Sequence, residues 1–528
     1  MSPNAATRAA SAPVVDTPYG RLRGASVAGV ARFLGVPYAQ APVGDRRLRS
    51  PRQIQPWAGE RDATAPGAAS LQTLAGNQTW LYEPIARMDE DCLFLNVWRP
   101  DAGARLPVIV WLHGGATRNG HGAAGAFDGA ALASSGRAVV VTINYRLGAL
   151  GGLAHPDLRD EESGYCANWG LQDKLAALAW VRECIAAFGG DPGRITLAGQ
   201  SSGAANAVMI AQGSVARGRI AGLIAQSPPL FQPPMFAELA DAADYTERLA
   251  RKLGVPVPEL RAIDGTALQR AEQVFSRSGA FPRPRTAPVR DGALILEWPH
   301  TGEIAAVPML IGSTRDEALF WYGLRDADGN VLSSSTPPQT PEDVVTQVAG
   351  LLRLHYPFDP APAPADVVAV YEDACGASTP DRCAETWSAI YTDLAFRAPI
   401  FHCAARHASR GHPAFVYEFA HALPAPGAGT PHAADVPFVF GTTGHPHLAR
   451  KVGHGPGVVA TANATMRMWA SFAWRGDPTA DGFTRWPRFS AERRDVMTIG
   501  AEAGTATPAS ARGDSQLACW TAFRGGTA

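Results

Sequence analysis

A serine flanked by glycines stands in the segment GQSSG, residues 199–203, which matches the pattern G-x-S-x-G. This pattern is typical of a tight turn between a strand and a helix that exposes the serine hydroxyl. The apolar stretch ITLA precedes the segment and the helical stretch AANAVMIA follows it, so both flanking elements are present. Because a serine hydroxyl becomes a good nucleophile only beside a base, the segment predicts Ser201 as a nucleophile. The alternative is an ordinary glycine-serine turn.

A second segment has the composition of an anion-binding loop. His113-Gly114-Gly115-Ala116 follows the apolar stretch PVIVWL, so its backbone N–H groups could point past the end of a strand. Backbone donors placed in this way stabilise the negative oxygen that forms during acyl transfer. The alternative is a glycine turn between a strand and a loop. Two such segments, each after a strand, favour a hydrolase that uses a serine.

The surrounding sequence predicts the elements that position these residues. Buried strands are predicted over 105–112 and 137–143, and a third over 194–200 leads into Ser201. A helix is predicted over 171–188, because its apolar residues recur at helical spacing and two glycines follow it. Strands that alternate with helices predict a mostly parallel sheet covered on both faces. Helical insertions over about 231–300 and 337–412 are expected at the C-terminal edge of that sheet, where ligands bind.

Many ordered segments resemble the type-B carboxylesterases, the family of cholinesterases and bacterial p-nitrobenzyl esterases. They include FLGVPYAQAPVGDRRLR, EDCLFLNVW, PVIVWLHGG, NWGLQDKLAALAWV, IGSTRDEALF and PHAADVPFVFG. The resemblance implies an α/β-hydrolase fold with a mostly parallel central sheet, flanking helices and an active-site gorge. It implies one domain over residues 15–525 after a flexible segment over 1–14, and a reaction that needs no cofactor and no metal.

The resemblance also implies the partners of Ser201. The acid of the family lies in a G-x-x-x-x-E segment, here GSTRDE, which indicates Glu317; Asp316 is the neighbour that could be confused with it. The base is the histidine before an acidic residue and an aromatic V-F-G run, which indicates His432. The order Ser, acid, His is the one expected for this fold. By the same pattern, the oxyanion hole consists of the N–H groups of Gly115, Ala116 and Ser202.

These residues imply ester hydrolysis through an acyl-enzyme. His432 acts as base and then as acid, and Glu317 orients the imidazole. The same machinery serves an amidase or a carbamate hydrolase, and the sequence leaves that alternative open. A non-catalytic binding protein of the same family is the third alternative. Ser227, in IAQSPP, matches a serine that supports the triad from behind; the other reading is a serine without contact to the site.

Four residues are candidates for a substrate pocket. Tyr82 occupies the position of the aromatic residue that lines the alcohol pocket of cholinesterases, and Gln200 replaces the usual glutamate before the nucleophile. Both changes disfavour a quaternary ammonium substrate. Thr117 and Arg118 follow the oxyanion loop, where the family has gorge-lining residues. Arg118 could bind a carboxylate of a multi-acid ester, or it could be a solvated residue at the rim.

Other matching positions are structural. The resemblance places buried ion pairs at Arg47 with Glu90 and at Arg146 with Asp173. Cys92 lacks its customary disulfide partner, because Ser70 stands where the second cysteine would be.

Composition restricts the partners and the location. The 528 residues carry 47 Lys plus Arg and 48 Asp plus Glu, a net charge of −1, which argues against a nucleic-acid partner. We find no apolar run of about 18 residues that could span a membrane, and no apolar core of a signal peptide near the N-terminus. Seven cysteines without a CxxC pair fit reduced thiols. We therefore expect a cytoplasmic enzyme that acts on a small-molecule ester, with secretion or a periplasmic location as the alternative if a signal peptide was removed. Monomer and dimer both remain open.

Overall fold

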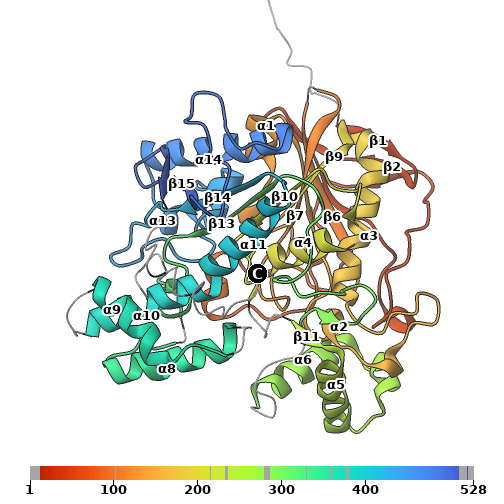
Figure 1. Cartoon of the computed structure of the whole chain (residues 1–528). Helices are drawn as coiled ribbons and strands as arrows, with labels where there is room; N and C mark the ends of the chain where they lie inside the picture. The colour runs from red at the N-terminus through yellow and green to blue at the C-terminus, as the bar shows by residue number, and fades with distance from the viewer. Residues whose placement is uncertain are drawn as a thin grey trace, which may run out of the picture.

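The computed structural model describes residues 12–520, except 102, 214–215, 232–235, 279–285, 327, 329, 334, 357–359, 376–379, 511–515 and 517–519. Its largest element is an eleven-stranded sheet (Figure 1) with the strand order β16-β15-β14-β13-β10-β9-β7-β8-β6-β4-β3. The strands are β3 (Ala25–Val27), β4 (Val30–Pro37), β6 (Phe94–Pro100), β7 (Leu106–Leu112), β8 (Val139–Ile143), β9 (Gly190–Gln200), β10 (Gly222–Gln226), β13 (Met309–Thr314), β14 (Ala414–Phe419), β15 (Asp495–Ile499) and β16 (Ala506–Ser510).

The centre of this sheet is parallel and its two edges are antiparallel. The parallel pairs join β8, β7, β9, β10, β13, β14 and β15. Strand β16 is antiparallel to β15, and β6, β4 and β3 continue the other edge in antiparallel fashion. The predicted mostly parallel sheet is confirmed, and β7, β8 and β9 lie where the sequence predicted strands.

Helices cover both faces of the sheet, as the all-buried strands require. In β7, Val108, Val110 and Leu112 belong to one buried cluster, and Ile109 and Trp111 belong to the other. The first cluster includes residues of α3 (Trp169–Cys184), α4 (Ser202–Gln212) and α11 (Ala398–Ser409). The second includes residues of α1 (Ala130–Gly136), α12 (Val436–Phe440) and α14 (Pro456–Arg475).

The insertions are helical, as the sequence predicted. The first carries α5 (Leu239–Leu253) and α6 (Gly265–Arg277), and the short strands β11 (Ala237–Glu238) and β12 (Val289–Arg290) pair at its base. The second carries α8 (Pro341–His355), α9 (Pro364–Cys375), α10 (Pro380–Thr392) and a π-helical turn over Asp393–Arg397. Figure 1 shows both groups beyond the same end of the sheet, at the bottom of the view.

The remaining elements are small. Strands β1 (Val14–Thr17), β2 (Gly20–Arg23) and β5 (Glu60–Asp62) form a separate three-stranded sheet. Short helices are α2 (Gly148–Gly152), α7 (Leu319–Tyr322) and α13 (Ala449–Val452). Of the segment expected to be flexible over 1–14, residues 1–11 lie outside the described residues, and β1 begins at Val14. Residues 521–525 of the predicted domain also lie outside them.

The structural predictions around the core are also met. Arg47 forms an ion pair with Glu90, and Arg146 forms one with Asp173 that is almost completely buried. Five described cysteines are free and buried: 92, 166, 184, 383 and 403. Burial raises the pKa of the Cys92 thiol, and Ser70 is its hydrogen-bonding neighbour. Among the helices of the described part of the chain, none is both long and apolar enough to cross a membrane.

Candidate active site

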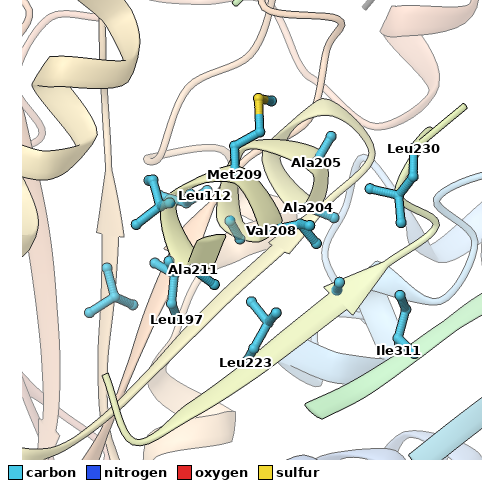
Figure 2. Close-up of a cluster of buried hydrophobic side chains, with 14 of the residues drawn as sticks. Leu112, Leu197, Ala204, Ala205, Val208, Met209, Ala211, Leu223, Leu230 and Ile311 are labelled. Atoms are coloured by element: carbon cyan, nitrogen blue, oxygen red, sulfur yellow. The ribbon is translucent and has the colours of Figure 1, made fainter. Parts of the chain in front are cut away.

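Ser201 lies at the sharp turn between β9 and α4. Its backbone has φ 56° and ψ −129°, a conformation that costs a non-glycine residue about 1–3 kcal/mol. Three features hold the turn: the Ser201 N–H donates to Gln226 O at 2.8 Å, the Ala205 N–H donates to Ser201 O at 3.0 Å, and α4 is packed on the sheet. Figure 2 shows this packing, with Ala204 and Val208 of α4 facing Leu197 and Leu223 of the strands below.

The two glycines of the motif are required by close backbone approaches. A Cβ at Gly203 would lie 2.1 Å from Leu112 O at the end of β7, and one at Gly199 would lie 2.6 Å from the carbonyl carbon of Gly203. Real Cβ atoms do not approach backbone atoms so closely. The glycines therefore allow the serine turn to lie directly against the strand that carries the candidate oxyanion loop.

The histidine and the acid meet at the same place. His432 Nδ1 forms a short hydrogen bond with Glu317 Oε2, and the His432 N–H lies 3.4 Å from Glu317 O. Since a carboxylate can only accept hydrogen bonds, Nδ1 carries the proton and Nε2 presents its lone pair. The side-chain amide of Gln200 donates to that Nε2 at 3.0 Å. His432 is thus held by Glu317 on one side and contacts the residue before Ser201 on the other.

Glu317, and not its neighbour Asp316, contacts the histidine. Glu317 is fully buried, and its Oε1 accepts hydrogen bonds from Ser227 Oγ at 2.5 Å and from the Thr314 N–H at 2.8 Å. Asp316 instead accepts from the Thr430 N–H at 2.9 Å. A buried carboxylate is tolerated only when donors surround it, and Glu317 has three.

Aromatic rings surround the imidazole. The ring centroids of Trp321 and Phe396 each lie 5.1 Å from that of His432, and Phe320 lies at 5.5 Å. Phe396 belongs to the π-helical turn over Asp393–Arg397, and such turns occur often at functional sites. These rings shield the histidine from water, which strengthens its hydrogen bond to Glu317.

The loop after β7 has an unusual backbone. Gly115, Ala116 and Thr117 have φ of 110°, 55° and 58°, and two of the three are not glycine. The Thr117 N–H donates to Ser202 Oγ at 3.2 Å, which ties the loop to the first turn of α4. Among the described residues, no acceptor is found for the N–H groups of Gly115 and Ala116. Unpaired N–H groups beside a serine can bind a developing oxyanion.

A buried layer of stacked side chains lies against this loop. His113 stacks on Tyr145 with ring centroids 4.3 Å apart, and the Tyr145 hydroxyl donates to His113 O at 2.6 Å. Burial lowers the pKa of His113 to about 3, so its imidazole carries no charge near pH 7. On the Tyr145 ring lies Lys174 Nζ, 3.4 Å from the centroid, and burial lowers the pKa of this amine to about 7.

Two of the predicted pocket residues have a different environment from the one expected. Tyr82 is 3% exposed; its ring packs on Phe127, and its hydroxyl donates to Gly114 O at 3.3 Å. It therefore packs against the oxyanion loop and does not present an open wall to a ligand. Arg118 forms a two-pronged ion pair with Glu272 of α6 at 2.9 and 3.0 Å, and 23% of its side chain stays exposed to solvent. Sequence reasoning missed Glu272, which stands 154 residues away.

Sequence reasoning also missed a polar network behind the acid. Gln226 donates to Asp435 Oδ2 at 2.8 Å and accepts from Trp469 Nε1 at 2.9 Å, and Tyr417 donates to the same Oδ2 at 3.0 Å. Burial raises the pKa of Asp435 to about 6. Asp435 and Gln226 both lie close in the sequence to residues of the motifs. That proximity was the only sequence signal that could have indicated this network. No group of three or more potential metal ligands occurs among the residues that the structure describes.

Known proteins resemble this chain over almost its whole length. A family profile described as "Carboxylesterase family" matches residues 11–518. The chain is 35% identical to a phenmedipham hydrolase of Pseudarthrobacter oxydans, over 93% of this chain and 95% of the relative. It is 32% identical to a fumonisin B1 esterase of Sphingopyxis macrogoltabida, over 90% and 84%. Among solved structures, a carboxylesterase of Geobacillus stearothermophilus matches with a TM-score of 0.80 and 31% identity, over 96% of this chain and 99% of that one.

Proposed function

Because the chain belongs to the carboxylesterase family and is a carboxylic ester hydrolase, we propose that it cleaves small-molecule esters through an acyl-enzyme on Ser201. The observation that carries the proposal is the pairing of His432 with the buried Glu317 beside the strained serine turn. Glu317 fixes the tautomer in which Nε2 carries a lone pair that can accept a proton. An amide donor from Gln200 on Nε2 favours the same tautomer before substrate arrives.

In the first half-reaction, Ser201 Oγ attacks the carbonyl carbon while His432 Nε2 takes the hydroxyl proton. The carbonyl oxygen becomes an oxyanion, which accepts hydrogen bonds from the N–H groups of Gly115, Ala116 and Ser202. Removing one such donor in other enzymes costs about 3–4 kcal/mol of transition-state stabilisation. When the carbon–oxygen bond to the alcohol breaks, His432 returns its proton to the leaving alkoxide and the acyl group stays on Ser201.

In the second half-reaction, water replaces the alcohol. His432 Nε2 takes a proton from water as its oxygen attacks the acyl carbon, and the tetrahedral species collapses to the free acid. The proton then returns from His432 to Ser201 Oγ, which restores the enzyme. Glu317 remains a carboxylate throughout and stabilises the imidazolium that forms twice in each cycle.

The test is hydrolysis of p-nitrophenyl butyrate by the wild type and by Ser201→Ala, each checked for folding by circular dichroism. We expect turnover by the wild type and a loss of at least about 10³-fold in kcat for the variant. Ser409→Ala, at an exposed serine that ends α11, is the matched control and should keep full activity. A fluorophosphonate should label the wild type at the peptide that contains Ser201. If Ser201→Ala keeps its activity, another residue is the nucleophile and the proposed triad is wrong.

A further inference from the structure

Arg118 stands directly after the proposed oxyanion loop, and the side-chain hydrogen bonds that the structure gives it go to the first helical insertion. Its Nη1 and Nη2 donate to Glu272 Oε1 and Oε2 at 2.9 and 3.0 Å. Nη1 also donates to Thr286 Oγ1 at 3.1 Å, and Nη2 to Ser276 Oγ at 3.2 Å. Two parallel hydrogen bonds between a guanidinium and a carboxylate fix orientation as well as distance.

Glu272 is held rigidly on its own side. It lies on α6, its side chain is fully buried, and the Tyr245 hydroxyl of α5 donates to its Oε1 at 2.7 Å. Burial of the Tyr245 hydroxyl raises its pKa, and the neighbouring Glu272 carboxylate raises it further, so this hydroxyl keeps its proton near pH 7. Both helices of the first insertion therefore hold the carboxylate that holds Arg118.

The loop that Arg118 follows needs such support. Ala116 and Thr117 have left-handed backbone conformations, which L-residues keep only when surrounding contacts determine them. Arg118 also closes the turn itself, because its N–H donates to Gly115 O at 3.0 Å. A displacement of Arg118 would thus reach the N–H groups of Ala116 and Gly115, which lie only two and three residues before it in the chain.

We infer that the Arg118–Glu272 pair is a positioning pair that holds the oxyanion loop against the first helical insertion, and that Arg118 does not bind a substrate carboxylate. The inference rests on the proposed function, since it concerns the oxyanion hole of that mechanism. Both terminal nitrogens of Arg118 already have two acceptors each, and a substrate anion would have to displace a buried carboxylate, which is costly to leave unpaired. The pair should therefore stabilise the transition state for neutral and charged esters alike.

The test compares Glu272→Gln and Arg118→Lys with the wild type on two esters, neutral p-nitrophenyl butyrate and anionic mono-p-nitrophenyl glutarate. We expect kcat to fall at least tenfold on both esters for Glu272→Gln, with KM changed less than threefold. Arg118→Lys keeps the positive charge but cannot form the two parallel hydrogen bonds of a guanidinium. Its kcat should therefore fall less than that of Glu272→Gln. A trifluoromethyl ketone forms an adduct with serine that mimics the oxyanion. Its affinity for each variant should fall in proportion to the fall in kcat of that variant.

The chain offers a matched control in a second two-pronged pair. Arg47 donates to Glu90 Oε1 at 2.5 Å and Oε2 at 2.6 Å, and Glu90 packs on Gly265, the first residue of α6. Glu90→Gln breaks a similarly placed pair that does not contact the loop. It should lower the melting temperature as Glu272→Gln does, yet keep kcat within about twofold.

Each other outcome overturns the inference. If KM rises for the anionic ester alone in Arg118→Lys and kcat is unchanged, Arg118 binds a substrate carboxylate. If Glu272→Gln lowers only the melting temperature, the pair is structural. Ser201→Ala is measured in the same assay: an inactive Ser201→Ala beside a fully active Glu272→Gln refutes only the positioning pair, whereas an active Ser201→Ala refutes the triad itself.

Discussion

Ser227 donates its hydroxyl to Glu317 on the side opposite His432, and it is fully buried. A carboxylate that must orient an imidazole needs its second oxygen fixed as well, because rotation about the side chain would misalign the first. Two donors, Ser227 Oγ and the Thr314 N–H, share Oε1 for this purpose. We therefore propose that Ser227 positions the histidine through the acid.

Ser227→Ala removes one of these two donors. A hydrogen bond to a charged group contributes about 1.5–3 kcal/mol, so we expect kcat for p-nitrophenyl butyrate to fall about 10- to 100-fold. KM should change little, because Ser227 contacts the acid and not the ester. Steady-state kinetics measure both constants, and circular dichroism verifies folding. An unchanged kcat beside a lowered melting temperature would show that Ser227 serves stability alone.

At the scale of elements, the site depends on how closely α4 approaches β7. The turn at Ser201 and the loop at Gly115 belong to neighbouring parallel strands, β9 and β7, whose C-terminal ends lie at one edge of the sheet. Gly203 allows α4 to begin against Leu112 O, so that the turn at Ser201 lies next to the end of β7. A larger residue at this position must separate the two elements.

Gly203→Ala places a methyl group where the Leu112 carbonyl oxygen would be 2.1 Å away. Neither backbone can yield without moving the site, so we expect a loss of about 1–3 kcal/mol in the free energy of unfolding. A fall of at least tenfold in kcat should accompany it. Gly444→Ala, at a glycine whose added Cβ meets nothing within 4 Å, is the control and should match the wild type. Urea unfolding measures the free energy of unfolding of both variants, and ester hydrolysis measures their kcat. If Gly203→Ala has the stability and the kcat of the wild type, the close approach of α4 to β7 is contradicted.

At the scale of the whole molecule, stability must depend on pH through groups that are buried in the core. Lys174 of α3 is one of them: its Nζ donates to Gly170 O at 3.0 Å and lies over Tyr145. Burial lowers its pKa from 10.5 to about 7, and the nearby Asp173 limits that decrease. Between pH 7 and 10.5 the unfolded chain therefore binds a proton that the folded chain has released.

Stability rises with pH wherever the unfolded state binds more protons. From pH 7 to pH 9, Lys174 should increase the free energy of unfolding by about 2 kcal/mol. Lys174→Met removes this contribution to the pH dependence. The free energy of unfolding of the variant should therefore decrease by about 2 kcal/mol relative to the wild type between pH 7 and pH 9. Urea unfolding at pH 7, 8 and 9 measures the difference. Lys252→Met, at an exposed lysine of α5, should show the slope of the wild type; an identical slope in Lys174→Met would show that the buried amine stays charged.

The local features of the fold follow from residues that are neighbours along the chain. Apolar runs predicted β7, β8 and β9 because a strand buried on both faces needs an unbroken apolar segment. The glycines around Ser201 predicted the serine turn because only residues without a Cβ fit there. Glu317 and His432 were found by their places in motifs, and the structure brings them into contact.

The distant contacts of each side chain depend on the tertiary structure. Gln200 reaches His432 over 232 residues, Gln226 reaches Asp435 over 209, and Arg118 reaches Glu272 over 154. It also decided that Tyr82 is buried against the oxyanion loop. Hydrophobic spacing and glycine placement describe the local backbone, whereas the partner of a charged or polar side chain depends on which distant element packs beside it. For this reason the sequence pointed to the proposed catalytic residues, and it could not point to the contacts that hold them in position.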